Sequence, residues 1–535
     1  MSILKIKFLG AAHEVTGSCT MIKTNSCCLL VDCGMEQGAD IYENCELPVD
    51  PSEIDFVLLT HAHIDHSGKL PLLYAKGFCG KIYATAATTR LCGIMLVDSA
   101  HIQEMEAEWK NRKSKRSGGQ FYEPMYTSRE AEECMNLFSS CRYNEWIKIN
   151  DEVTVRYIDA GHLLGSASIE VKISENNVEK TILFSGDVGN INRPLIKDPQ
   201  KPEFADYVVI ESTYGNRLHG MRPDYVGQLT TVIYKTFERG GNVVIPSFAV
   251  GRTQEMLYLI REIKSQGLLK KFGNFPVWVD SPLAVEATEI YSEDMYEYCD
   301  EETRQLLKAG IDPLKFSNLN LSITSEDSVA INNDPTPKII ISASGMCEAG
   351  RIRHHLKHNL WRKDSTILFV GYQAEGTLGR VLIEGTKTVK LFGEEIAVNA
   401  DIQTMEGISG HADMNMLLDW LGSIKNKPEM VFVNHGHDTV CDEFAQSIVR
   451  KLSIPATAPY NGAEYDLAEF KCLDFGNTVR LKTKVNKRAK AVFERLVQAG
   501  QRLLDVIDQN RGCANKDLAK FADQINELCS KWERK

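Results

Sequence analysis

The stretch LLTHAHIDHSG, residues 58–68, places three histidines and one aspartate within six positions. His61 and His63 alternate, so an extended backbone puts both imidazoles on one side, and Asp65 and His66 can turn toward a neighbouring point. Imidazole and carboxylate groups suit Zn²⁺ or a similar divalent ion. The motif therefore predicts a metal site that can serve two ions. The alternative interpretation is a histidine-rich polar turn.

Apolar runs that are typical of β-strands precede the motif and recur between residues 152 and 210 and near residue 430. Each run ends in a polar side chain, and α/β sheets place their chemistry in the loops that follow the strands. These strand-end candidates are Asp32, His162, Asp187, Glu211 and His435.

Two ions need more ligands than the motif supplies. We expect His162 to complete a three-histidine set with His61 and His63, and Asp187 to bridge both ions. His435 is expected to complete a second set with the remaining aspartate and histidine of the motif. Any one of these residues alone is more often a turn or core residue, but their joint placement after apolar runs favours a metal centre.

The composition is that of a multidomain globular protein. A chain of 535 residues is too long for one hydrophobic core, and 43% hydrophobic and 25% charged residues are ordinary values. The fifteen cysteines lack paired C-x-x-C spacing, so we expect reduced thiols and a cytoplasmic location. Neither a signal peptide nor an apolar stretch of membrane-spanning length is recognised, so no membrane partner is expected.

The net charge of −11, from 61 basic and 72 acidic residues, argues against broad, non-specific attraction to nucleic acid. It does not exclude an enzyme whose positive charge is local, because bound metal ions do not appear in the count. The most basic stretch, WKNRKSKRSGG at residues 109–119, is expected to be an exposed loop.

Strand-and-turn patterns dominate the first part of the chain, and strand–helix units follow from about residue 216. Repeated units of this kind imply a parallel sheet in a second α/β domain. Short strands near residues 387–403 and the later strand-end histidines suggest that this domain is inserted into the first. The last part has apolar residues at helical spacing and predicts two amphipathic helices. The expected segments are 1–212 and 395–483 for the first domain, 213–394 for the insert and 484–535 for the helical extension.

These motifs resemble a known family. HxHxDH with the downstream GHLLGS and SGD is similar to the metallo-β-lactamase fold. FLGAAHEVTGSC, VDCGMEQG, ESTYG, PSFAVGRTQE, DSPLA, SASGM, SGHAD and NHGH resemble its β-CASP branch, above all the endonuclease subunit of cleavage and polyadenylation specificity factor and its prokaryotic relatives. The resemblance covers about residues 3–480. It implies an α/β fold: a metallo-β-lactamase αββα sandwich with an inserted β-CASP domain and a C-terminal helical extension.

The resemblance assigns roles to individual residues. Asp32 is a carboxylate that orients ligands, the metal ligands are those proposed above, and the branch-specific motifs fall on Glu211, His411 and His435. In this family, the members that process RNA have a histidine at the last motif. The resemblance therefore favours RNA as the substrate, and we expect this RNA to be single-stranded. Relatives often dimerise, which leaves a homodimer open.

The expected chemistry is phosphodiester hydrolysis with two zinc ions, endonucleolytic by resemblance. His411, held by Glu211, is the candidate general acid, because histidine titrates near neutral pH and a carboxylate partner keeps it protonated. The products would carry a 3′-hydroxyl and a 5′-phosphate.

The inserted domain is expected to grip the substrate. The backbone N–H groups of Ser344, Gly345 and Met346 can cradle a phosphate at a helix end, and Arg252 can contact the RNA backbone. Ordinary turns between strand and helix are an equal alternative. Three further histidines are expected on a helix surface, outside the site: His354, His355 and His358.

Two other functions remain open from the sequence. A non-catalytic RNA-binding scaffold is the first, although the full ligand set counts against it. A small-molecule metallo-hydrolase of the thioesterase kind is the second, and the large insert that would roof the site favours a long substrate instead.

Overall fold

The computed structural model describes residues 4–38, 42, 46–117, 119–176, 178–220, 223–405, 407, 409–481, 500, 502–504, 506–507, 509–510 and 514–532. Met1–Val479 form one compact unit and Arg480–Lys535 a second. Of the two predicted C-terminal helices, the first lies mostly outside the described residues, and the second is α15 (Asn515–Trp532).

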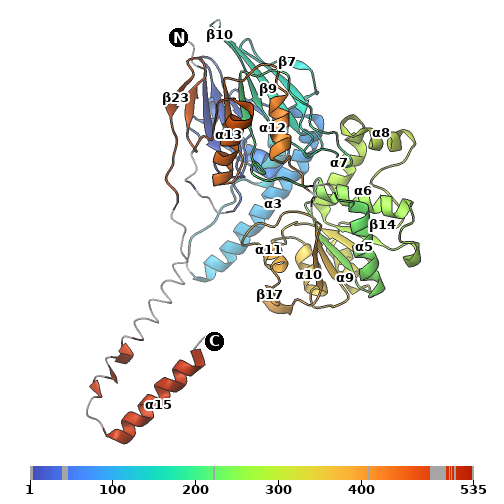
Figure 1. Cartoon of the computed structure of the whole chain (residues 1–535), viewed down its shortest axis with the longest axis vertical. Coiled ribbons are helices and arrows are strands. Elements are labelled where there is room, and N and C mark those ends of the chain that lie inside the picture. The colour runs from blue at the N-terminus through green and yellow to red at the C-terminus, as the bar shows by residue number, and fades with distance from the viewer. Residues whose placement is uncertain are drawn as a thin grey trace. The chain divides into compact units, whose positions relative to one another are not determined.

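An eight-stranded mixed sheet forms one half of the first domain (Figure 1). Its strand order is β23-β22-β1-β2-β3-β4-β5-β6, and β3 to β6 run parallel to one another. The bounds are β1 (Lys5–Gly10), β2 (Cys19–Lys23), β3 (Cys28–Val31), β4 (Phe56–Leu58), β5 (Lys81–Thr85), β6 (Phe138–Cys141), β22 (Glu464–Asp466) and β23 (Lys471–Asp474).

A seven-stranded sheet forms the other half. Its order is β21-β20-β11-β10-β9-β8-β7, so strands from both ends of the chain meet in it. The bounds are β7 (Trp146–Lys148), β8 (Val153–Asp159), β9 (Ala167–Glu175), β10 (Val178–Phe184), β11 (Tyr207–Ile210), β20 (Met430–Val433) and β21 (Ala456–Thr457).

Successive residues along a strand point to opposite faces of the sheet and so pack in different layers of the domain. In β3, Leu29 and Val31 join a core that also contains Ile169 and Phe432 of the second sheet, whereas Leu30 faces the helices on the other side. The outer helices of the first sheet are α1 (Ile64–Ser67), α2 (Leu70–Ala75), α3 (Ala86–Ser117) and α4 (Ser128–Cys134). The second sheet is covered by α12 (Met414–Gly422) and α13 (Asp438–Leu452). The expected αββα sandwich is therefore confirmed.

The inserted domain has a six-stranded parallel sheet in the order β14-β13-β15-β12-β16-β19 (Figure 1). Its strands are β12 (Val243–Pro246), β13 (Val277–Asp280), β14 (Leu319–Ser322), β15 (Ile339–Ser342), β16 (Thr366–Phe369) and β19 (Asp401–Thr404). Its helices are α5 (Tyr225–Glu238), α6 (Arg252–Ser265), α7 (Pro282–Tyr298), α8 (Glu301–Lys308), α9 (Ser325–Asn333), α10 (Ile352–Asn359) and α11 (Leu378–Ile383).

The inserted sheet continues beyond residue 395. The first domain is predicted to resume there, while β19 pairs in parallel with β16 and so belongs to the inserted sheet. β17 (Thr388–Leu391) and β18 (Glu394–Ala397) form a separate hairpin. A short strand carries no signal for which of two sheets it joins, so the pattern of residues 387–403 did not reveal this pairing, and the boundary at residue 395 stays a prediction.

The basic stretch is also different from the prediction. Residues 109–117 are not a loop but the last turns of α3, which continues to Ser117. Lys, Arg and Glu are good helix formers, so a charged segment can extend a helix whose first turns are packed against the sheet. Among the described helices, none combines the length and the apolar character needed to cross a membrane.

Candidate metal centre

The histidine motif begins in the loop between β4 and α1 and continues into α1, which contains Asp65 and His66. Leu58 ends β4 and His63 is the N-cap of α1. Because β3 and β4 are parallel neighbours, Asp32, directly after β3, lies beside this loop, and its Oδ1 accepts a hydrogen bond from the Thr60 backbone N at 2.8 Å. Its Oδ2 accepts a second bond from Nδ1 of His66 at 2.7 Å. Asp32 thus orients His66 so that Nε2 is the nitrogen left for a metal ion.

The first predicted donor set comes together around His63. Nδ1 of His63 lies 3.0 Å from Nε2 of His61 and 3.3 Å from Nε2 of His162. The same two Nε2 atoms lie 3.5 and 3.6 Å from Oδ2 of Asp187. Three histidines and one carboxylate oxygen therefore surround one point, as predicted from the sequence.

The second predicted set lies on the other side of Asp187. Nε2 of His66 is 3.0 Å from Nε2 of His435, which in turn is 3.5 Å from Oδ2 of Asp65. Oδ1 of Asp187 is 3.3 Å from Nε2 of His66 and 3.5 Å from Nδ1 of His435. The two oxygens of Asp187 thus face different donor sets, which is the arrangement expected of a bridging ligand.

The donor chemistry fits divalent cations. Asp187 Oδ1 is buried and accepts no hydrogen bond of good geometry from any described residue. Burial and the neighbouring His66 lower the pKa of His61 well below its ordinary value, and burial together with His411 does the same for His162. Neutral imidazoles whose nitrogens converge at 3.0 to 3.3 Å present their lone pairs to a common point. Nitrogen and carboxylate donors in this number suit zinc.

A carboxylate–histidine pair lies beside the two sets. Glu211 follows β11, and both of its carboxylate oxygens lie 3.2 Å from Nδ1 of His411. Oε1 of Glu211 also accepts a hydrogen bond from the Val188 backbone N at 2.6 Å, which fixes the carboxylate. Burial opposes protonation of His411, but the charges of Glu211 and Asp187 outweigh it and raise its pKa to about 9. His411 therefore carries a proton at neutral pH and remains partly exposed, with 22% of its side chain accessible.

Comparison with known families gives matches along the chain: the metallo-β-lactamase superfamily at residues 14–128, the Beta-Casp domain at 253–382 and the Zn-dependent metallo-hydrolase RNA specificity domain at 395–459. Ribonuclease TTHA0252 of Thermus thermophilus is 34% identical over 87% of this chain and 99% of the relative. Transcription termination factor FttA of Methanosarcina mazei is 30% identical over 86% of this chain and 71% of the relative. An RNase J-like protein of Methanocaldococcus jannaschii is 32% identical over 85% and 98%. The chain belongs to the β-CASP branch of the metallo-β-lactamase superfamily.

The family expected from the motifs is thereby confirmed, and the chain is a metal-dependent hydrolase of the β-CASP ribonuclease family. The inserted six-stranded sheet is its β-CASP domain, whose match begins one residue after the start of α6.

The N-terminal motif FLGAAHEVTGSC holds the loop that carries His435. The backbone N of His435 donates to Ala11 O at 2.8 Å, and that of Gly436 donates to Glu14 O at 3.0 Å. His435 has a φ of 49°, in the left-handed region that is unfavourable for residues with a Cβ. These bonds stabilise that backbone conformation and so direct the imidazole toward the second donor set.

The loop that carries His411 is held by two residues, Arg193 and His219, which the sequence analysis did not identify. Arg193 Nη1 donates to the carbonyl oxygens of His162 and Gly410 at 2.8 and 3.0 Å. His219 Nε2 lies 2.9 Å from the carbonyl oxygen of His411. Neither residue follows a strand of apolar residues, so the strand-end pattern carried no signal for them.

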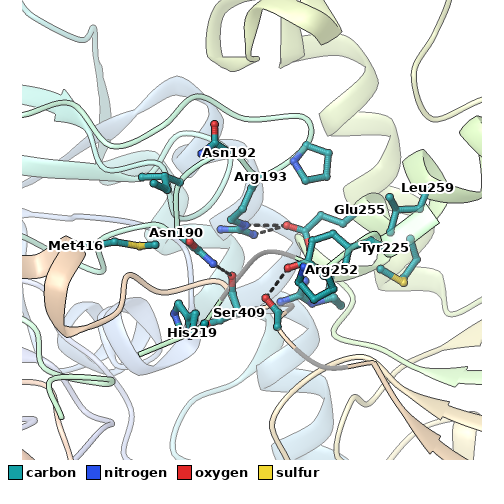
Figure 2. A pocket seen from close by; sticks show the side chains of 16 residues that line it. Asn190, Asn192, Arg193, His219, Tyr225, Arg252, Glu255, Leu259, Ser409 and Met416 are labelled. Carbon is teal, nitrogen blue, oxygen red and sulfur yellow. Dashed lines mark hydrogen bonds and ion pairs between the residues drawn. The ribbon is translucent and has the colours of Figure 1, made fainter. Parts of the chain in front are cut away.

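The predicted contact residue Arg252 begins α6, as expected, and lines a cavity of about 230 Å³ between the two domains (Figure 2). Its guanidinium pairs with Glu255, which also pairs with Arg193 at 2.5 Å. One carboxylate thus serves two guanidinium groups in the cavity, and the contact of Arg252 with RNA stays a prediction.

The SASGM loop differs in part from the prediction. Ser344, Gly345 and Met346 follow β15, but α10 begins only at Ile352, so these residues do not form a helix N-terminus. The backbone N of Ser344 donates to Ala349 O at 3.4 Å. A phosphate cradle would therefore consist of loop amides alone, and it stays a prediction.

His355 corrects the expectation for the three histidines of α10. His354 and His358 are exposed, whereas His355 is fully buried, with Nε2 2.6 Å from Oδ2 of Asp280. Asp280, the first residue of DSPLA, ends β13, and Arg351 also donates to it at 2.7 Å. The partner of His355 is remote in sequence, so helical spacing could not reveal its burial.

Replacement of Asp187 by alanine is expected to remove at least one metal ion per chain, because the two oxygens of Asp187 face different donor sets. The metal content of purified, zinc-loaded protein can be measured by mass spectrometry. Glu170→Ala is a matched control, since Glu170 is equally buried, in the neighbouring strand β9, but pairs with Arg156. Retention of both ions in Asp187→Ala would contradict the bridging role.

Proposed function

We propose that the protein is a zinc-dependent RNA-processing endonuclease that holds two ions and hydrolyses phosphodiester bonds of single-stranded RNA. The observation that carries this proposal is the position of Asp187 between two donor sets, with the protonated His411 directly beside them. The match to an RNA specificity domain and the likeness to a protein named as a ribonuclease support RNA as the substrate.

The residues would divide into two groups. His61, His63 and His162 would hold one ion, Asp65, His66 and His435 the other, and Asp187 would bridge them. Zinc bound there supplies positive charge that offsets the phosphate and makes a water acidic enough to ionise near neutral pH.

The proton for the leaving group comes from His411. Glu211 engages Nδ1, so Nε2 is the nitrogen that can donate to the departing 3′ oxygen. The pKa of about 9 keeps this proton in place until the bond to phosphorus breaks. Donation to the 3′ oxygen leaves a 3′-hydroxyl on one fragment and a 5′-phosphate on the other.

The assay that tests this function incubates end-labelled single-stranded RNA with the zinc-loaded protein and with an Asp65→Ala/His66→Ala double variant. We expect internal cuts with 5′-phosphate ends for the native protein and loss of cutting for the variant. Uncut RNA with tight binding would indicate a scaffold. Fast hydrolysis of a small thioester with uncut RNA would indicate a small-molecule hydrolase, and either result would refute the proposal.

His411→Ala is expected to lower kcat on RNA by about 10²-fold or more, because general acid catalysis of the leaving group is lost. Metal content should remain that of the native protein. Metal analysis and single-turnover kinetics on the same preparation provide the two readouts. A loss of metal in this variant would make His411 a ligand, which its grouping with Asp187 and Glu211 also permits, and would sink the general-acid assignment.

A further inference from the structure

Two aromatic side chains are exposed at the carboxyl end of the β-CASP sheet. Phe248 follows β12 and is 45% exposed, and Tyr372 follows β16 and is 56% exposed. Because β12 and β16 are parallel neighbours, these residues lie at the same edge of the sheet. Parallel α/β sheets bind ligands at this edge. A single exposed aromatic needs no explanation, but two at adjacent strand ends of this edge are consistent with a ligand.

The ring of Phe248 rests on glycine backbone. A Cβ atom at Gly345 would lie 3.1 Å from its Cδ2, and one at Gly371 would lie 3.9 Å from its Cε2. Gly345 belongs to the SASGM loop after β15, and Gly371 directly precedes Tyr372. Two loops therefore approach the ring without side chains, which positions it but leaves nearly half of the side chain accessible.

Hydrogen bonds fix the backbone around this ring. The buried Gln373 donates through Nε2 to the carbonyl oxygens of Gly345 and Gly371 at 3.0 and 3.2 Å, which ties the two loops together. The carbonyl oxygen of Phe248 accepts a bond from Oγ1 of Thr253 at 2.8 Å. A rigid, exposed ring loses little conformational entropy when a flat ligand stacks on it.

A third aromatic residue lies beside the proposed general acid. The ring of Tyr214 lies 6.1 Å from that of His411, edge to face.

We propose that Phe248 and Tyr372 form a base-stacking platform for single-stranded RNA at the carboxyl end of the β-CASP sheet. The proposal rests on the proposed function and names how the β-CASP domain would bind the substrate. Aromatic rings stack on every nucleobase, so the platform would bind RNA without sequence preference. Bases within a duplex are already stacked and paired, which restricts the platform to unpaired RNA.

The test compares Phe248→Leu and Tyr372→Leu with Trp361→Leu as a matched control. Trp361 is 57% exposed in the same domain, but it lies between α10 and β16 and hence at the opposite end of the sheet. Each platform variant is expected to raise KM for a single-stranded RNA oligonucleotide by about tenfold, with a smaller change in kcat. The Kd for the same oligonucleotide, measured by fluorescence anisotropy, should rise by about the same factor. The control should match the native protein.

A base-free substrate separates stacking from damage to the metal centre. Hydrolysis of bis(p-nitrophenyl) phosphate should be unchanged in both platform variants. An equal loss on this substrate and on RNA would mean that the substitutions disturb the centre, and unchanged KM and Kd for RNA would mean that no base stacks there. Either result would overturn the platform.

Oligonucleotides with one abasic nucleotide give the sharpest version of this test. At the positions that stack, removal of the base should weaken binding to the native protein about tenfold but leave binding to the matching Leu variant almost unchanged. If the loss of affinity from base removal and the loss from the Leu substitution added together at every position, stacking on these rings would be refuted. Because anisotropy needs no cleavage, a native protein that binds RNA in this manner but does not cut it would refute the proposed function and leave the platform supported.

Discussion

The buried carboxylate of Asp187 is the constraint on which the site depends. An ionised group that is 2% exposed is costly to bury unless opposite charge lies close to it, and the charges of His435, His66 and His411 outweigh burial and hold the pKa of Asp187 well below its ordinary value. Five histidines lie within 4.0 Å of this carboxylate, on the segments that follow β4, β8, β19 and β20. The αββα sandwich brings these segments to one edge, so the proposed metal centre needs both sheets.

The β-CASP domain is coupled to that edge through buried charge. Glu255 of α6 pairs with Arg193, and Arg193 donates to the carbonyl oxygens of His162 and of Gly410, which precedes His411. A hydrophobic core that is continuous from α3 to α7 adds an apolar contact between the domains. The insert therefore supports the loop that carries His411, the proposed general acid.

The convergence of the proposed donors could be predicted from the sequence because each donor follows a strand or belongs to the compact motif, where spacing reflects geometry directly. Their role as metal ligands stays a prediction. The αββα class and the insert followed from strand and helix patterns in the same way. Burial of His355 and the roles of Arg193 and His219 depend on partners far away in sequence, so no local pattern contains them. The sheet that β19 joins and the helical state of residues 109–117 are likewise decided by tertiary packing and helix continuation.

The central claim, that two ions share Asp187, is tested most directly by anomalous diffraction at the zinc absorption edge from crystals of the zinc-loaded protein. We predict two peaks, one among His61, His63 and His162 and one among Asp65, His66 and His435, with one oxygen of Asp187 beside each. A single peak, or a peak between Glu211 and His411, would contradict the account.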